Sequence, residues 1–129
     1  MEDLDKIAIY IDKDKKSPFR QQLWLGLDHE ARSVIKHALL RILEIDNRFK
    51  VSTKLLKSLG GDLYELRISR PLLLRVFISF RKNGELLVLH GYNKRKRNSK
   101  RFQQAQIHQA RMMLKEFMKN GQHISWEDL

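Results

Sequence analysis

Three strand-like segments in the second half of the chain restrict the possible folds most strongly. They span residues 63–68, 72–80 and 86–92 and are rich in leucine, valine, isoleucine and aromatic residues, as β-strands are. The segment 69–71 (SRP) separates the first two, and Asn83-Gly84 separates the second two. Asn-Gly between two such runs is a strong hairpin signal. The pattern therefore predicts three consecutive antiparallel strands.

Two helices are expected before these strands. Ser17-Pro18 is a good helix start, and that helix should end near Gly26. Asp28 should cap a longer amphipathic helix, whose buried stripe has the helical spacing i, i+3, i+4, i+7, i+11 and i+14. The stripe comprises Ala31, Val34, Ile35, Ala38, Ile42 and Ile45. Because so few residues join the two helices, we expect an antiparallel helical hairpin.

The ends of the chain complete the predicted fold. Residues 6–11 (KIAIYI) read as a first strand, and residues 99–119 as a last helix with Ile107, Ala110, Leu114 and Phe117 on one stripe. The tail 120–129 has no clear assignment. The predicted class is α+β: a helical hairpin packed on a small, mainly antiparallel sheet, in the order β-α-α-β-β-β-α. We expect a single domain over residues 1–129.

Positive charge is concentrated in one part of the chain. Residues 50–101 contain 14 Lys and Arg but three Asp and Glu, whereas basic and acidic residues balance on either side, so this segment carries the whole net charge of +11. A concentrated excess is typical of a protein that binds a polyanion. A solvated basic surface without a ligand is the alternative, but concentration in one segment favours nucleic acid.

Several other kinds of site have little support. The chain has no cysteine, which excludes disulfides, a cysteine nucleophile and a thiolate metal site. No set of His, Asp and Glu has metal-ligand spacing, so we expect neither a metal nor another cofactor. No apolar run reaches the ~18 residues of a membrane-spanning helix, and the N-terminus has no signal-peptide pattern. We therefore expect a cytoplasmic protein with no membrane partner.

The register of the predicted strands places polar residues together. With Asn83-Gly84 as a two-residue turn, the apolar pairs Phe80–Leu87 and Ile78–Leu89 share one face. With a three-residue loop at 69–71, Leu66 faces Leu74. The opposite face, which we expect to be open to solvent, then pairs Phe77 with His90, Arg75 with Tyr92 and Glu65 with Arg75. That face gathers Glu65, Arg67, Arg75, Phe77, His90 and Tyr92.

Each of these residues also has a structural interpretation. Glu65 and Arg75 can form an ion pair that only stiffens the sheet, whereas Arg67 has no predicted partner opposite it, which favours a functional role. His90 is either a site residue or a buried, hydrogen-bonded histidine. The basic run Lys94-Arg95-Lys96-Arg97 follows the last strand. Cations beside an aromatic ring are the groups that hold an RNA phosphate and stack a base.

An ordered set of motifs resembles the RelE/ParE superfamily of toxins, and most closely its phage-derived HigB-like branch. The resemblance covers residues 17–117. Its pieces are KLLK at 54–57, Gly60-Gly61, LYELR at 63–67, RVF at 75–77, LLVLHGYNKRKR at 86–97, and a last helix with Ala105 and Ala110. The chain departs from the family pattern in lacking a tyrosine in the last helix, so that Phe102 or Tyr92 would have to stack a base. Leu72-Leu73-Leu74 also replaces a usual polar-Tyr stretch.

This resemblance implies a function. It implies a toxin that cleaves mRNA on the ribosome and a cognate HigA-like or RelB-like antitoxin, with DNA contacted only through that antitoxin. Lys54 and Lys57 resemble lysines that grip the message and supply a general base. Arg67 and Arg75 resemble arginines that stabilise the scissile phosphate, with His90 nearby. Tyr92 and Lys94, Arg95, Lys96 and Arg97 resemble a segment that binds RNA or protonates the leaving group.

Two other functions remain open. A ParE-like relative would act on DNA gyrase, although Lys54, Lys57 and the basic run argue against it because a gyrase inhibitor needs no phosphate site. A non-catalytic RNA-binding module would bind with a steep salt dependence and leave the RNA intact.

Overall fold

A computed structural model of the protein describes residues 3–45 and 54–129. Its strands are β1 (Ile7–Tyr10), β2 (Leu56–Gly60), β3 (Leu63–Ile68), β4 (Leu74–Phe80), β5 (Leu86–Asn93) and β6 (His123–Ser125). Its α-helices are α1 (Pro18–Gln22), α2 (His29–Glu44) and α3 (Lys100–Asn120). Short 3-10 helices lie at Leu4–Lys6, Trp24–Gly26 and Trp126–Asp128.

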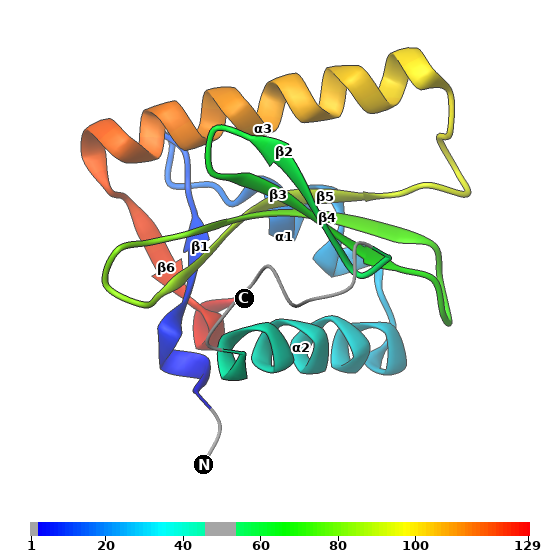
Figure 1. Ribbon diagram of the computed structural model, residues 1–129, viewed down its shortest axis with the longest axis horizontal. Helices are drawn as coiled ribbons and strands as arrows, with labels where there is room; N and C mark the ends of the chain where they lie inside the picture. The colour runs from blue at the N-terminus through cyan, green and yellow to red at the C-terminus, as the bar shows by residue number, and fades with distance from the viewer. Residues whose placement is uncertain (1–2, 46–53) are drawn as a thin grey trace.

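The strands form one mixed sheet between two layers of helix. Their order is β2-β3-β4-β5-β1-β6, in which β1 is parallel to β5 and the other neighbours are antiparallel. Helix α2 lies along one face of the sheet and α3 along the other (Figure 1). The predicted α+β class with a mainly antiparallel sheet is therefore confirmed.

The predicted helix starts are confirmed at atomic detail. The backbone N–H of Arg20 donates to Ser17 Oγ at 3.1 Å, and that of Ala31 donates to Asp28 Oδ1 at 2.9 Å. Helix α3 likewise begins after Ser99, whose hydroxyl accepts from the N–H of Phe102 at 3.1 Å. Each cap satisfies a backbone donor that has no partner within its helix.

The first helix is shorter than the predicted hairpin requires. Leu23 leaves the helical conformation (φ −130°, ψ −58°), and the chain continues as the 3-10 helix Trp24–Gly26. This break places the Trp24 ring 5.0 Å from Trp126 and 5.7 Å from Phe19. Helix α1 packs mainly on β5 and β1, so it is a short support for these inner strands rather than one arm of a long hairpin.

The hairpin between β4 and β5 has a different turn from the one predicted. The N–H of Arg81 donates to Glu85 O and that of Gly84 donates to Arg81 O, which makes a three-residue loop with Gly84 at φ +84°. Phe80 therefore pairs with Leu86 rather than Leu87. A β-bulge follows between Ile78 and Phe77, and it restores the predicted pairs Phe77–His90 and Arg75–Tyr92.

The register between β3 and β4 is two residues from the predicted one. Leu66 pairs with Val76 instead of Leu74, because the connecting loop covers residues 69–73. A shift by two keeps each side chain on its predicted face but changes which residues are opposite. Glu65 now faces Phe77, and Arg67 faces Arg75. The predicted direct pairing of Glu65 with Arg75 is wrong.

Two strands have no counterpart in the predicted order. Strand β2 forms the edge beside β3, and β6 pairs with β1 from within the unassigned tail. The tail also contains Trp126, which is buried in the core beneath α2 together with Ile7 and Ile9. Strands β2 and β6 therefore extend the sheet beyond the predicted strands at both sides.

The expected open face of the sheet is covered. Ala110 and Phe117 of α3 pack on it with Leu63, Leu87 and Leu89 in a second hydrophobic core. The polar residues expected there are consequently mostly buried: Phe77 and His90 have no exposed surface, and Tyr92 is 6% exposed. The prediction of a solvent-open polar face is therefore wrong, and the accessible part of this face lies at its edges.

Candidate functional site

Two rows of side chains cross the face of the sheet beneath α3. The first row follows the strand pairing Lys57–Glu65–Phe77–His90 from β2 to β5. The second follows Arg67–Arg75–Tyr92 from β3 to β5. Alternate residues of a strand point to the same side, so the two rows face the same layer. The fold thus brings together residues that are far apart in sequence.

Glu65 links the two arginines of the second row. Its Oε1 accepts a hydrogen bond from Arg67 Nε at 2.9 Å and lies 3.7 Å from Arg75 Nε. Arg75 also donates from Nη1 to the carbonyl of Leu74 at 3.1 Å. The carboxylate is thus held between two guanidinium groups. As expected, Arg67 has no opposite charge directly across from it, since it faces Arg75; its charge partner, Glu65, lies two residues away on the same strand.

Arg67 is the most accessible member of this cluster. Its side chain is 31% exposed, compared with 11% for Arg75 and 8% for Glu65. Glu65 is bound through Nε of Arg67, and within residues 3–45 and 54–129 no hydrogen bond to either terminal Nη group is found. A guanidinium anchored in this way presents two parallel donors, the geometry that suits two oxygens of one phosphate.

His90 is buried and held through both ring nitrogens. Nε2 lies 3.1 Å from the carbonyl oxygen of Gln106, and Nδ1 lies 3.2 Å from the side-chain amide of Gln22. Its ring stacks on Phe77 at 4.9 Å. Burial lowers the pKa of His90 to about 4, so the imidazole is neutral at pH 7 and donates from Nε2. The structure brings His90 to the site rows but gives it no contact with solvent.

Tyr92 joins the charged cluster to an aromatic group. Its ring lies 6.1 Å from Phe77 and meets Phe102 edge-on at 5.3 Å. Burial, followed by the negative charge of Glu65, raises the pKa of Tyr92 to about 12. The phenol therefore stays protonated at neutral pH. Phe102, one of the two residues expected to stack a base, lies against Tyr92 at the border of the Glu65–Arg67–Arg75 cluster.

Two of the predicted lysines lie at the free edge of the sheet. Lys57 is exposed on β2, opposite Glu65, and Lys54 is exposed just before that strand. Lys57 therefore belongs to the same face as Arg67, one strand further out. The structure brings this lysine and both arginines to one region of the sheet.

The basic run forms a tight turn after β5. The N–H groups of Lys96 and Arg97 donate to Asn93 O, and that of Arg95 donates to Asn93 Oδ1. Lys94 is half-buried, because its N–H donates to Leu73 O at 2.8 Å, whereas the other three side chains are exposed. Arg97 lies over the Phe102 ring at 4.4 Å. The turn thus carries cations to the side of the cluster opposite Lys57.

Sequence reasoning missed the residues that hold the site from outside the sheet. Gln22 and Gln106 fix His90, and neither has a local signal, because the contact joins segments that are distant in the chain. The role of Glu65 had such a signal. Residues i and i+2 of a strand share a face, which predicts contact between Glu65 and Arg67.

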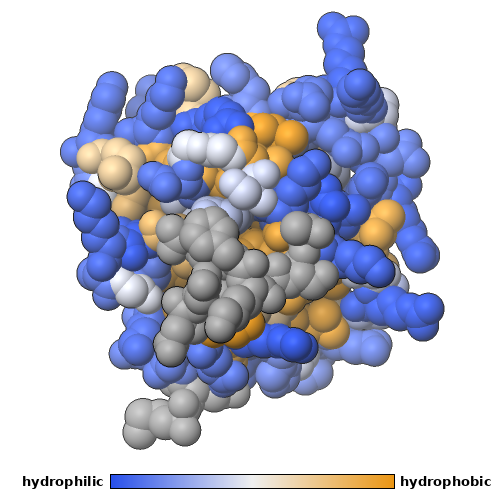
Figure 2. Space-filling view, in the orientation of Figure 1, coloured by the Kyte–Doolittle hydropathy of each residue, from blue (hydrophilic) through white to orange (hydrophobic). Residues whose placement is uncertain are grey.

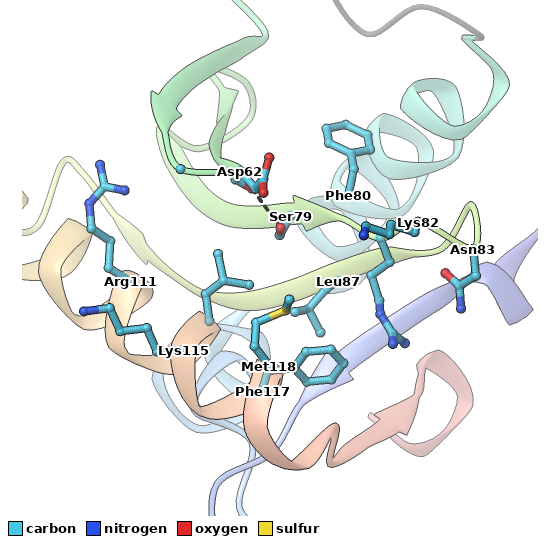
Figure 3. Close-up of a pocket in the computed structure, with 13 residues that line it drawn as sticks. Asp62, Ser79, Phe80, Lys82, Asn83, Leu87, Arg111, Lys115, Phe117 and Met118 are labelled. Atoms are coloured by element: carbon cyan, nitrogen blue, oxygen red, sulfur yellow. Dashed lines mark hydrogen bonds between the residues drawn. The ribbon is translucent and has the colours of Figure 1, made fainter.

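A separate cavity of about 620 Å³ lies at the other end of β3. Phe117 and Met118 of α3 face Leu87 of β5 across it (Figure 3). The two arginines that line it already have partners within the protein. Arg81 pairs with Glu85 at 2.8 Å, and Arg111 donates to the carbonyls of Leu59 and Gly60. Lys82 and Lys115 also line this cavity, but its lining is mainly apolar, so we place the candidate site at Arg67, where charged side chains are clustered.

The structure also bears on a metal site and on a membrane-spanning helix. Within the described ranges, no group of three or more His, Cys, Asp and Glu side chains is placed to hold a metal ion. No helix among the same residues has the length and apolar character needed to cross a membrane. Hydrophilic residues dominate the face of the molecule seen in Figure 2, and apolar residues show between them in separate groups.

Comparison with known protein families matches most of the chain to a family model. The family model described as "Phage derived protein Gp49-like (DUF891)" matches residues 22–115, about three quarters of the chain. The matched range includes α2, strands β2 to β5 and most of α3, and therefore every residue of the two rows. A search among curated proteins found no match.

Proposed function

Because the chain belongs to the phage-derived Gp49-like family, part of the RelE-like group of toxins from toxin–antitoxin systems, we propose that it is a type II toxin that cleaves mRNA. The proposed activity is that of a metal-independent endoribonuclease of the HigB kind, acting on messages at the ribosome and inhibiting translation. A cognate antitoxin of the HigA or RelB kind would neutralise it.

The observation that carries this proposal is the anchored guanidinium of Arg67. Glu65 binds its Nε at 2.9 Å, and neither Nη group has a hydrogen bond among the residues described. Arg75 and Lys57 add positive charge on the same face. Donors fixed before the substrate arrives stabilise developing negative charge without reorganising during the reaction. A cluster of this kind suits a phosphodiester, whose oxygens gain charge in the transition state.

RNA supplies its own nucleophile in the proposed reaction. The 2′-oxygen forms a bond to the adjacent phosphorus, the bond to the 5′-oxygen of the next nucleotide breaks, and a 2′,3′-cyclic phosphate and a 5′-hydroxyl result. Lys57, with Lys54, takes the proton of the 2′-hydroxyl as general base. Arg67 and Arg75 neutralise charge on the phosphate oxygens. A cation of the run 94–97 gives a proton to the departing oxygen.

The buried residues of the two rows have a positioning role in this proposal. His90 and Phe77 have no exposed surface, so we assign them to holding β4, β5 and α3 in place rather than to contact with RNA. Tyr92 touches both Phe77 and Phe102 and keeps its proton, so it serves as a neutral wall of the site. This assignment leaves Lys54, Lys57, Arg67 and Arg75, together with the proton donor of the run 94–97, as the proposed catalytic residues.

The exposed cations offer a surface for the macromolecular partners. Arg95, Lys96 and Arg97 project from the turn after β5, where they can bind ribosomal RNA or the message through phosphates. An antitoxin with acidic side chains would compete for the same surface. In this proposal, the protein contacts DNA only through the antitoxin.

The test is to add the purified protein to a translating extract and map mRNA ends by primer extension. The proposal predicts new 5′ ends inside the message and a halt in translation. A parallel reaction without ribosomes tests ribosome dependence. Intact message with inhibited gyrase supercoiling would contradict the proposal in favour of a ParE-like activity, and RNA that is bound but not cleaved would indicate a passive binding module.

A further inference from the structure

A cavity of about 490 Å³ opens beside the last part of β5. Strand β1 pairs only with residues Leu86–Val88 of β5, and α1 packs against the rest of that edge. Gly91 allows this close approach, since a Cβ there would lie 2.6 Å from Arg75 O and 2.8 Å from Leu23 Cδ2. The cavity remains where α1 and the first half of α3 separate. Its volume is in the range of small-ligand sites.

The walls of this cavity carry amides and aromatic rings. Gln22 of α1 and Gln106 and Gln109 of α3 line it, and each side-chain amide offers both a donor and an acceptor. The edge-to-face pair Tyr92–Phe102, at 5.3 Å, supplies flat apolar surface. A planar ligand with alternating donors and acceptors along its edge fits such walls, and nucleobases have this character.

The charges at the mouth agree with this class of ligand. Lys96 and Arg97 line the cavity, whereas no carboxylate of the residues described does so. Of the lining amides, those of Gln106 and Gln109 make no hydrogen bond to the protein among the residues described. Gln22, in contrast, is engaged with His90 Nδ1. Two amides are therefore available to a ligand that also carries negative charge.

The cavity adjoins the proposed phosphate site. Tyr92 forms part of its wall and is also the strand partner of Arg75, which in turn faces Arg67. Neighbouring strands are about 4.8 Å apart, so the backbones of Arg67 and Tyr92 are separated by roughly 10 Å. A short stretch of single-stranded RNA spans this separation, with a phosphate at Arg67 and a base beyond Tyr92.

We propose that this cavity, here called the base pocket, binds an unpaired nucleobase of RNA and reads its edge through Gln106 and Gln109. This inference rests on the proposed function and adds a site that selects where the message is cut. The ring pair Tyr92–Phe102 provides the surface on which the base lies, and Lys96 and Arg97 bind an adjacent phosphate.

The first test is a titration of the isotope-labelled protein with the four nucleoside 5′-monophosphates, followed by NMR of the glutamine side-chain amides. Inorganic phosphate serves as the probe for charge alone. We expect the nucleotides, but not phosphate, to shift the Gln106 and Gln109 amide signals, and one base to bind more tightly than the others. Equal spectra with phosphate and with all four nucleotides would overturn the inference.

The second test uses Gln109→Ala, with Gln104→Ala as the matched control. Both residues are exposed on α3, but only Gln109 lines the cavity, so neither change should prevent folding. Loss of one hydrogen bond should weaken binding of the preferred nucleotide about three- to tenfold in Gln109→Ala and leave Gln104→Ala unchanged. Wild-type binding by Gln109→Ala and by Gln106→Ala would contradict the base pocket.

The two proposals fail in distinguishable ways. If the nucleotides bind as expected but the wild-type protein cleaves no message in a translating extract, the base pocket stands and the endoribonuclease proposal fails. If message is cleaved but the distribution of cleavage sites is the same in wild type, Gln106→Ala and Gln109→Ala, the endoribonuclease proposal stands and the base pocket fails.

Discussion

Glu65 Oε1 lies 2.9 Å from Nε of Arg67, so the carboxylate anchors the guanidinium through Nε, and neither terminal nitrogen has a hydrogen bond among the residues described. The same oxygen is 3.7 Å from Arg75 Nε. Like charges face each other on β3 and β4, and the acidic residue between them offsets their repulsion. Glu65 is therefore a positioning residue for both arginines in our account.

Glu65→Gln should reduce cleavage by about tenfold or more, since a hydrogen bond to a charged group contributes roughly 1.5–3 kcal/mol. It should also lower the pKa of Tyr92 from its value of about 12, because the negative charge of Glu65 raises that pKa. Single-turnover cleavage and NMR titration of the tyrosine ring measure the two effects. Glu85→Gln, which affects the distant pair with Arg81, is the control. An unchanged Tyr92 titration would contradict this arrangement.

Gly91→Ala should destabilise the protein by about 1–3 kcal/mol, the usual effect of overpacking. The added Cβ would lie 2.6 Å from the backbone oxygen of Arg75, which cannot move without disturbing the sheet. Gly26→Ala is the matched control, since no atom lies within 4 Å of a Cβ there. Urea denaturation measures both variants. Equal stability of the two would show that α1 does not pack on β5 this closely.

His90 should lower the free energy of unfolding of the protein in acid. Its folded pKa of about 4 is below the ordinary value of about 6.5, so the unfolded chain binds more protons between these values. The stabilising effect of the neutral imidazole is complete above pH ~6.5 and is lost as the pH falls towards 4, by about 3 kcal/mol in total.

Denaturation between pH 7 and pH 4 tests this expectation. His90→Gln should show a smaller loss of stability over this range than the wild type, even if it is less stable at pH 7. His108→Gln, which changes an exposed histidine of α3, should keep the wild-type dependence. An identical pH profile for wild type and His90→Gln would contradict a buried neutral imidazole.

The basic turn should control the salt dependence of RNA binding. Each phosphate contact on a single strand contributes about 0.7 to the slope of log K against log salt. The double variant Arg95→Ala/Lys96→Ala should therefore reduce this slope by about 1.4, measured by fluorescence anisotropy with a 2′-O-methyl RNA that cannot be cleaved. Lys115→Ala/Lys119→Ala, at the other end of α3, should retain it. Equal slopes for the wild type and Arg95→Ala/Lys96→Ala would show that the turn does not contact RNA.

Much of the fold could be predicted from local patterns. The caps at Ser17 and Asp28, the long amphipathic helix and the central strands all lie close to their predicted positions. Strand β2 (LKSLG) was missed because its polar residues and terminal glycine are typical of an exposed edge. Strand β6 has only three residues, too few for a periodic signal.

The covered face was the main error, and its cause is physical. The apolar stripe of α3 predicts that this helix packs on something, but a stripe does not specify which face it covers. The better signal was in β5, where Leu86–Leu89 is continuously apolar. A strand of this kind is typical of a sheet that is buried on both faces. The β-bulge beside His90 gave no local signal, since it compensates for the longer turn at Gly84.

The most direct test of the central claim is the rate of message cleavage by Arg67→Ala in a translating extract, mapped by primer extension. Loss of one fixed donor to the developing charge should lower this rate by about 10²–10³-fold, while circular dichroism shows an unchanged fold. Arg67→Lys should recover little, because it restores the charge without the two-pronged geometry. Arg41→Ala, an exposed arginine of α2 on the other side of the sheet, should cleave like wild type. Wild-type cleavage by Arg67→Ala would contradict the account.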